Sequence, residues 1–64
     1  MRYDELKELE GKKISVNLKS GTFLNGVITE VVDTGDNLIW VHIIDKFGKL
    51  AVFLNTEIVE LKER

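Results

Sequence analysis

The chain has 64 residues, which is room for one small domain near the size where apolar burial barely offsets the loss of chain entropy. The sequence contains no cysteine and a single histidine, so disulfide bonds and a Cys/His metal site are excluded as stabilising elements. Hydrophobic residues make up 44% and charged residues 31%, as in folded globular chains, and a net charge of -2 gives no overall attraction for phosphate backbones.

The sequence indicates a single cytoplasmic domain over residues 1–64. No apolar run approaches the roughly 18 residues that cross a bilayer, and the acidic stretch 1–10 does not resemble a signal peptide. The sequence shows no nucleophile, histidine and carboxylate pattern, no phosphate-binding glycine loop and no paired metal ligands. We therefore expect no enzyme activity, no cofactor, no metal and no membrane contact.

The first predicted element is a short helix over residues 4–10. Leu6 and Leu9 share one helical face, Asp4 is placed as the N-cap, and Gly11 is placed to end the helix. A helix this short is unstable alone, so its two leucines are expected to pack on the end of a barrel.

Five strands are predicted next, over residues 13–19, 22–32, 38–45, 49–54 and 57–62. Apolar and polar residues alternate in the first strand, as expected for one buried and one solvated face. Gly26 lies in the second strand, where a missing side chain allows a sharp bend or a close backbone approach. The third strand is apolar on both faces, which predicts that both are covered, by the bent sheet or by a partner.

Only Asn55 and Thr56 separate the last two predicted strands. A break this abrupt redirects the chain and leaves the two flanking strands as exposed sheet edges. The sequence contains no proline that would block pairing at either edge. Self-association is thus the expected source of additional stability for so small a domain.

Two segments resemble the signatures of the Sm-like family, which includes the Sm and LSm proteins and bacterial Hfq. The first comprises Leu18-Lys19-Ser20-Gly21, Gly26, Asp33 and Asn37-Leu38, and the second is the apolar strand, polar break and apolar strand of residues 51–61. The resemblance implies an all-β fold, a small, strongly bent five-stranded SH3-like barrel behind a short N-terminal α-helix. It also implies a homo-oligomeric ring, usually of about six or seven copies, in which the fourth strand pairs with the fifth strand of the next copy.

The resemblance further implies binding of single-stranded RNA, U- or A-rich, at the pore or ring face. Asp33 would brace the loop and Asn37 would read a base edge with its amide. The complete set of candidate RNA-binding residues is Asp33, Gly35, Asp36, Asn37, Asn55 and Thr56.

Three departures from the family pattern affect this interpretation. Gly35 stands where the family often has a stacking histidine or aromatic residue, and Asn55-Thr56 replace an arginine-glycine pair, so the stacking platform and the cationic wall are missing. The segment 26–33 is one residue longer than the family spacing, which predicts a bulge in the second strand or an altered loop.

Plainer interpretations stand beside these. Any tight turn selects Asp, Gly and Asn, and Asn55 can simply cap the break between two strands. Three lysines, Lys12, Lys13 and Lys19, could form a basic rim or a solvated face balanced by Glu8 and Glu10. Two aromatic residues, Trp40 and Phe47, could stack on bases or pack in the protein. The alternative function is a Sm-like oligomeric scaffold for protein contacts with little or no RNA binding, and a more distant one is a monomeric SH3-like or OB-like module.

Overall fold

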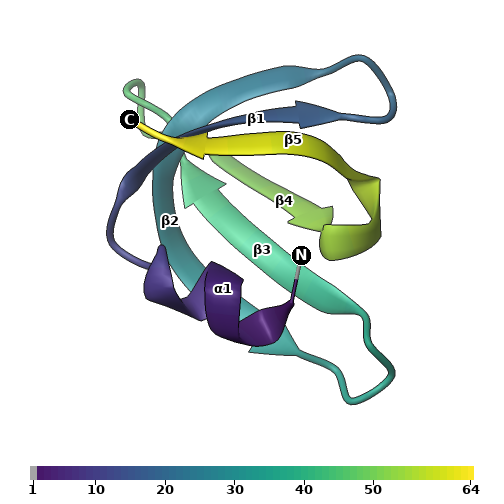
Figure 1. Ribbon diagram of the computed structural model, residues 1–64. Coiled ribbons are helices and arrows are strands. Elements are labelled where there is room, and N and C mark those ends of the chain that lie inside the picture. The colour runs from purple at the N-terminus through teal and green to yellow at the C-terminus, as the bar shows by residue number, and fades with distance from the viewer. Residues whose placement is uncertain (1) are drawn as a thin grey trace.

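The computed structural model describes residues 2–64 as one helix and five strands (Figure 1). The elements are α1 (Tyr3–Glu8), β1 (Lys13–Leu18), β2 (Phe23–Asp33), β3 (Ile39–Ile44), β4 (Leu50–Leu54), the 3-10 helix η1 (Asn55–Glu57) and β5 (Ile58–Glu63). The predicted N-terminal helix and five strands are confirmed, with ends that differ by one or two residues.

The strands form one antiparallel sheet in the order β4-β3-β2-β1-β5. The first strand pairs with both β2 and β5, so that Val16 lies opposite Leu24 on one side and Leu61 on the other. Within residues 2–64, β4 and β5 each have one paired neighbour, and the sheet is open between them. The prediction that the last two strands are sheet edges is confirmed, whereas hydrogen bonds do not close the sheet of this single chain into a barrel.

At Gly26, β2 passes too close to the backbone of β3 to leave room for a side chain. A β-carbon at this position would overlap the carbonyl oxygen of Ile44, the last residue of β3. Figure 1 shows β2 as a long, strongly curved ribbon that contributes to both halves of the sheet. The predicted need for glycine here is confirmed, and its reason is a close backbone approach.

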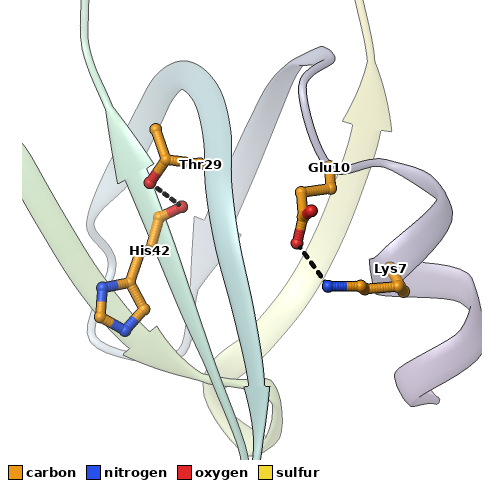
Figure 2. Close-up of polar contacts among 4 residues, drawn as sticks. All are labelled: Lys7, Glu10, Thr29 and His42. Carbon is orange, nitrogen blue, oxygen red and sulfur yellow. Dashed lines mark hydrogen bonds and ion pairs between the residues drawn. The ribbon is translucent and has the colours of Figure 1, made fainter.

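An extra residue in β2 produces a β-bulge. The pairing register between β2 and β3 shifts between Ile28 and Glu30, so Thr29 is the additional residue. Its hydroxyl donates a hydrogen bond of 3.3 Å to the carbonyl of His42 (Figure 2). The bulge expected from the long 26–33 segment is confirmed, and it adds to the bend of the strand.

The core lies on one side of the bent sheet. Leu6 of α1 has no exposed surface, and Leu9 packs against the same cluster, so the predicted apolar helix face is confirmed. Full burial of a leucine side chain contributes about 1.5–3 kcal/mol to the free energy of folding. This contribution stabilises a helix that is too short to form alone. The buried cluster consists of Leu6, Ile14, Val16, Ile28, Val31, Ile39, Val41, Ile43 and Phe53.

The cap of α1 differs from the prediction. The helix begins at Tyr3 with Arg2 as the N-cap, so the assignment of Asp4 to that position is wrong. The reason is a contact in the first turn, where the backbone N–H of Arg2 donates to the Glu5 carboxylate at 3.1 Å. After the helix, Gly11 adopts a positive φ of 85° and its N–H donates to the carbonyl of Ile28 at 2.7 Å.

An ion pair follows the helix on its exposed side. The ammonium group of Lys7 lies 2.9 Å from the Glu10 carboxylate (Figure 2). This hydrogen bond raises the pKa of Lys7 above its ordinary value of 10.5. Because both side chains are solvated, the pair adds little to stability.

The outer face of β3 is not covered by the rest of the described chain. Trp40 is 40% exposed and Ile44 is 39% exposed, and on the adjacent β4 Leu50 and Val52 are 60% and 44% exposed. The prediction that the bent sheet covers both faces of the third strand is therefore wrong for a single chain. The sheet curves around one core, so β3 buries only the face that carries Val41 and its neighbours.

Candidate nucleic-acid interface

The loop between β2 and β3 is a compact turn held by its own side chains. The carboxylate of Asp33 accepts a hydrogen bond of 2.8 Å from the N–H of Gly35. The hydroxyl of Thr34 donates to the carbonyl of Leu38 at 2.6 Å. Gly35 and Asn37 have φ values of 93° and 61°, in the left-handed region that glycine and asparagine tolerate best. Asp33 therefore braces this loop, and the turn chemistry explains why these residue types occur in it.

Asn55 ties this loop to the break between the last two strands. It is the first residue of η1, and its side-chain oxygen accepts a hydrogen bond of 3.0 Å from the N–H of Ile39. Its side-chain nitrogen donates to the carbonyl of Asn37 at 3.1 Å. Both ends of the amide thus bind main-chain groups, as expected for a residue that fixes the chain at a break.

A hollow of about 410 Å³ opens beside this junction. It collects three of the six residues singled out from the sequence, Asp33, Asn37 and Asn55. The other three are absent from its lining, because Gly35 and Asp36 project at the exposed tip of the loop and Thr56 lies on the exposed side of η1. The complete lining is Arg2, Tyr3, Asp4, Asp33, Asn37, Ile39 and Asn55.

The start of α1 contributes residues that the sequence interpretation missed. Arg2, Tyr3 and Asp4 line the hollow, and the partly buried Tyr3 also packs against the core cluster. An aromatic residue and an arginine therefore line the hollow, although Gly35 offers no ring and Asn55-Thr56 offer no cation. Glu5, three residues after Arg2, is the sequence signal that would have placed the helix start correctly.

The polar groups of the hollow differ in their freedom to bind a ligand. Within residues 2–64, the side-chain amide of Asn37 makes no hydrogen bond, so it can both donate to and accept from a planar ring edge. Arg2 carries one positive charge, and Asp4 and Asp33 carry two negative charges, so the hollow has no positive excess for phosphates. The hollow is thus better suited to the planar ring edge of a nucleobase than to the phosphates of a nucleic-acid backbone.

The lysines and aromatic residues considered from the sequence lie elsewhere. Lys12, Lys13 and Lys19 are exposed, as expected for a solvated face. Lys12 pairs with Glu63 at 3.9 Å and Glu10 pairs with Lys7, so Glu10 does not pair with Lys12. The cause is the pairing of β1 with β5, which brings the C-terminal strand alongside the first. Two aromatic rings stand exposed outside this hollow, Trp40 on the outer face of β3 and Phe47 in the β3–β4 turn.

Within residues 2–64, no group of three or more histidine, aspartate or glutamate side chains is arranged to hold a metal ion. No helix in the same range has the length and apolar character needed to cross a bilayer. No protein-family model, curated protein or solved structure matches the chain. Its function is therefore inferred from the sheet edges, the hollow and the sequence signatures.

Proposed function

We propose that this chain is a Sm-like protein that assembles into a ring with copies of itself and binds single-stranded RNA. The observation that carries the proposal is the position of β4 and β5 at the two ends of one antiparallel sheet, each with a single paired neighbour in residues 2–64. The free edge of β4 on one copy can pair with the free edge of β5 on the next. Because these two edges differ, the contact is head-to-tail, and its repetition gives a ring where the rotation between copies closes and a fibre where it does not. The proposal takes the closed ring.

In this proposal each copy is a strongly bent, open SH3-like barrel whose two edge strands are covered by neighbouring copies. Gly26 and the bulge at Thr29 support the proposal, because both devices sharpen the curvature of a strand. The break at η1 supports it as well, since β4 and β5 follow one another in sequence without pairing.

Exposed apolar side chains on the edge strands favour association. Val52 of β4 is 44% exposed and Val59 of β5 is 65% exposed, and β4 is apolar along its whole length from Leu50 to Leu54. Burying such side chains in an edge-to-edge contact contributes roughly 25 cal/mol per Å² of apolar surface. Assembly would stabilise a domain whose own core is small.

The proposed RNA site is the hollow at the junction of α1, the β2–β3 loop and η1. Tyr3 provides a ring on which a base can stack, and the amide of Asn37 provides hydrogen bonds to a base edge. Arg2 provides the one cation for a phosphate, while Asp33 and Asn55 hold the loop in shape. Repetition around a ring would place several such sites on one face, which strengthens binding of a strand that spans them.

Two measurements test the proposal. Light scattering is expected to give a multiple of the 7.3 kDa chain mass, and a 7.3 kDa species at the concentration used for binding would remove the ring. Fluorescence anisotropy with labelled oligo-U and oligo-A at two salt concentrations is expected to show binding that is tighter at low salt. If intact rings bind neither oligomer at low salt, the RNA-binding part of the proposal is lost.

A second candidate function is a Sm-like scaffold that contacts proteins and has little RNA affinity. It is favoured by the absence of a positive excess in the hollow, by the engagement of the Asn55 amide with the main chain, and by the exposed apolar face around Trp40. Nuclease treatment separates the two candidates. A tagged chain that retains a protein partner after nuclease digestion supports the scaffold, and recovery of RNA cross-linked near Asn37 supports RNA binding.

A further inference from the structure

A second and larger hollow lies at the opposite end of β3 from the first. The strand begins at Ile39, which lines the first hollow, and ends at Ile44, which lines the second. The volume of the second hollow is about 940 Å³, within the range of small-molecule sites. Figure 1 shows the β3–β4 turn and the C-terminal end of β5 at this same end of the sheet.

Positive charge is concentrated in this second hollow. Lys13, Lys46 and Arg64 line it, and among residues 2–64 Asp45 contributes the one side-chain carboxylate of the lining. One oxygen of Asp45 already accepts hydrogen bonds from the N–H groups of Phe47 and Lys49, each at 2.9 Å. On a chain with a net charge of -2, this local excess attracts anions to one place on the surface.

Two exposed phenyl rings share the lining with these cations. Phe23 is 55% exposed and Phe47 is 77% exposed, so neither ring is needed mainly for the core. The ammonium group of Lys46 lies 5.2 Å from the centroid of the Phe47 ring, a cation–π distance. Rings that remain open to solvent beside cations are the combination on which bases stack in single-stranded nucleic acid sites.

Asn25 adds a directional polar group. Its side-chain oxygen accepts hydrogen bonds of 2.6 Å from the hydroxyl of Ser15 and from the guanidinium of Arg64. These bonds fix the orientation of the amide, whose NH2 group makes no hydrogen bond within residues 2–64. The side chain therefore offers donors to the acceptor atoms of a planar ring.

We propose that this second hollow binds a nucleotide, with its base against Phe23 and Phe47 and its phosphate near Lys13, Lys46 and Arg64. The amide of Asn25 donates to the base. The ligand is a free nucleotide or one unit of a single strand, since both present the same base and phosphate. The site shares no residue with the hollow proposed to bind RNA around Tyr3 and Asn37, so each can fail alone.

Nuclear magnetic resonance on the 15N-labelled chain tests this site. Adenosine and uridine monophosphates, and then short oligo-A and oligo-U, are titrated at low salt. The backbone amides of Phe23, Gly26 and Phe47 are expected to shift with the mononucleotides, and these shifts are followed separately from any shift of Asn37 in the first hollow. A site that favours a strand is expected to shift the same three amides at much lower oligonucleotide concentration, which identifies the strand as the source.

Two substitutions at exposed positions test the roles of ring and charge. Phe47→Ala and Lys46→Gln are each expected to weaken binding in this hollow, the former by about tenfold. Matched controls outside the hollow, Val32→Ala for the apolar residue and Lys19→Gln for the cation, are expected to leave binding there unchanged. Circular dichroism checks that all four variants fold.

Two results would contradict the proposed nucleotide site. One is that neither the mononucleotides nor the oligonucleotides shift the amides of the second hollow at low salt. The other is that folded Phe47→Ala and Lys46→Gln proteins bind as well as the parent chain. Mononucleotide-induced shifts at Phe23 and Phe47 that persist in an Asn37→Gly variant would support the second hollow and show that it acts independently of the first.

Discussion

The N–H of Ile39 donates a hydrogen bond of 3.0 Å to the side-chain oxygen of Asn55, 16 positions further along the chain. Ile39 is only 4% exposed, so its N–H has little access to water. The same Asn55 amide donates to the carbonyl of Asn37 at 3.1 Å. One side chain thus fixes the start of β3, the end of the β2–β3 loop and the turn between the two edge strands.

Replacement of this amide should destabilise the domain. Asn55→Ala leaves the partly buried N–H of Ile39 without its partner, and we expect the free energy of unfolding to fall by about 1–3 kcal/mol. Urea denaturation followed by circular dichroism measures the change. Thr56→Ala, at the exposed neighbouring position, is the control and should stay within about 0.5 kcal/mol of the parent. Equal stability of the Asn55→Ala and Thr56→Ala proteins would contradict a bracing role.

A methyl group at position 26 should be poorly tolerated. Gly26→Ala places a β-carbon against the carbonyl of Ile44, so β2 and β3 must separate or the bend must relax. We expect a loss near the upper end of the about 1–3 kcal/mol typical of overpacking, seen as a lower urea midpoint. Thr22→Ala, an exposed residue just before β2, is expected to change little. A Gly26→Ala protein with the stability of this control would show that the close approach is not required.

The strand pattern could be predicted from the sequence because it follows from local chemistry. Alternation in β1, the turn residues after β2 and the brief break at Asn55-Thr56 each specify their element without long-range information. The position of β4 and β5 at the two sheet edges followed from that break. The bulge at Thr29 was expected only from the resemblance, because the segment 26–33 is one residue longer than the Sm-like spacing.

The content of the hollows could not be predicted in the same way. Tyr3 reaches the first hollow because α1 starts before Asp4, and helix ends are set by caps that single residues can shift. Lys13, Phe47 and Arg64 come from three separate segments, and the pairing of β1 with β5 and β2, together with that of β2 with β3, brings them to one end of the sheet. Such clusters depend on the three-dimensional arrangement of the strands and leave no local signal in the sequence.

Charges placed on the edge strands should dissociate the assembly. Val52→Lys and Val59→Lys alter exposed side chains of β4 and β5, so the single chain should still fold, while a lysine at an edge opposes strand pairing. Light scattering is expected to show a shift from the oligomer to the 7.3 kDa chain for the double variant. Thr22→Lys adds the same charge away from both edges and should leave the oligomer intact. A double variant that keeps the mass of the parent assembly would exclude pairing between β4 and β5 of neighbouring copies.

Loss of the free amide at Asn37 should weaken RNA binding without disturbing the loop. Because Asn37 has a φ of 61°, Asn37→Gly removes the side chain while keeping a residue that accepts this backbone conformation. Tyr3→Leu removes the ring but keeps apolar contact with the core, and loss of a base stack of about 1–3 kcal/mol predicts roughly tenfold weaker binding. Anisotropy with oligo-U on intact oligomers measures both variants, with Ser20→Gly in the exposed β1–β2 turn as the control. If both variants bind oligo-U as tightly as Ser20→Gly does, the strand is held elsewhere on the protein, and Tyr3 and Asn37 serve the fold alone.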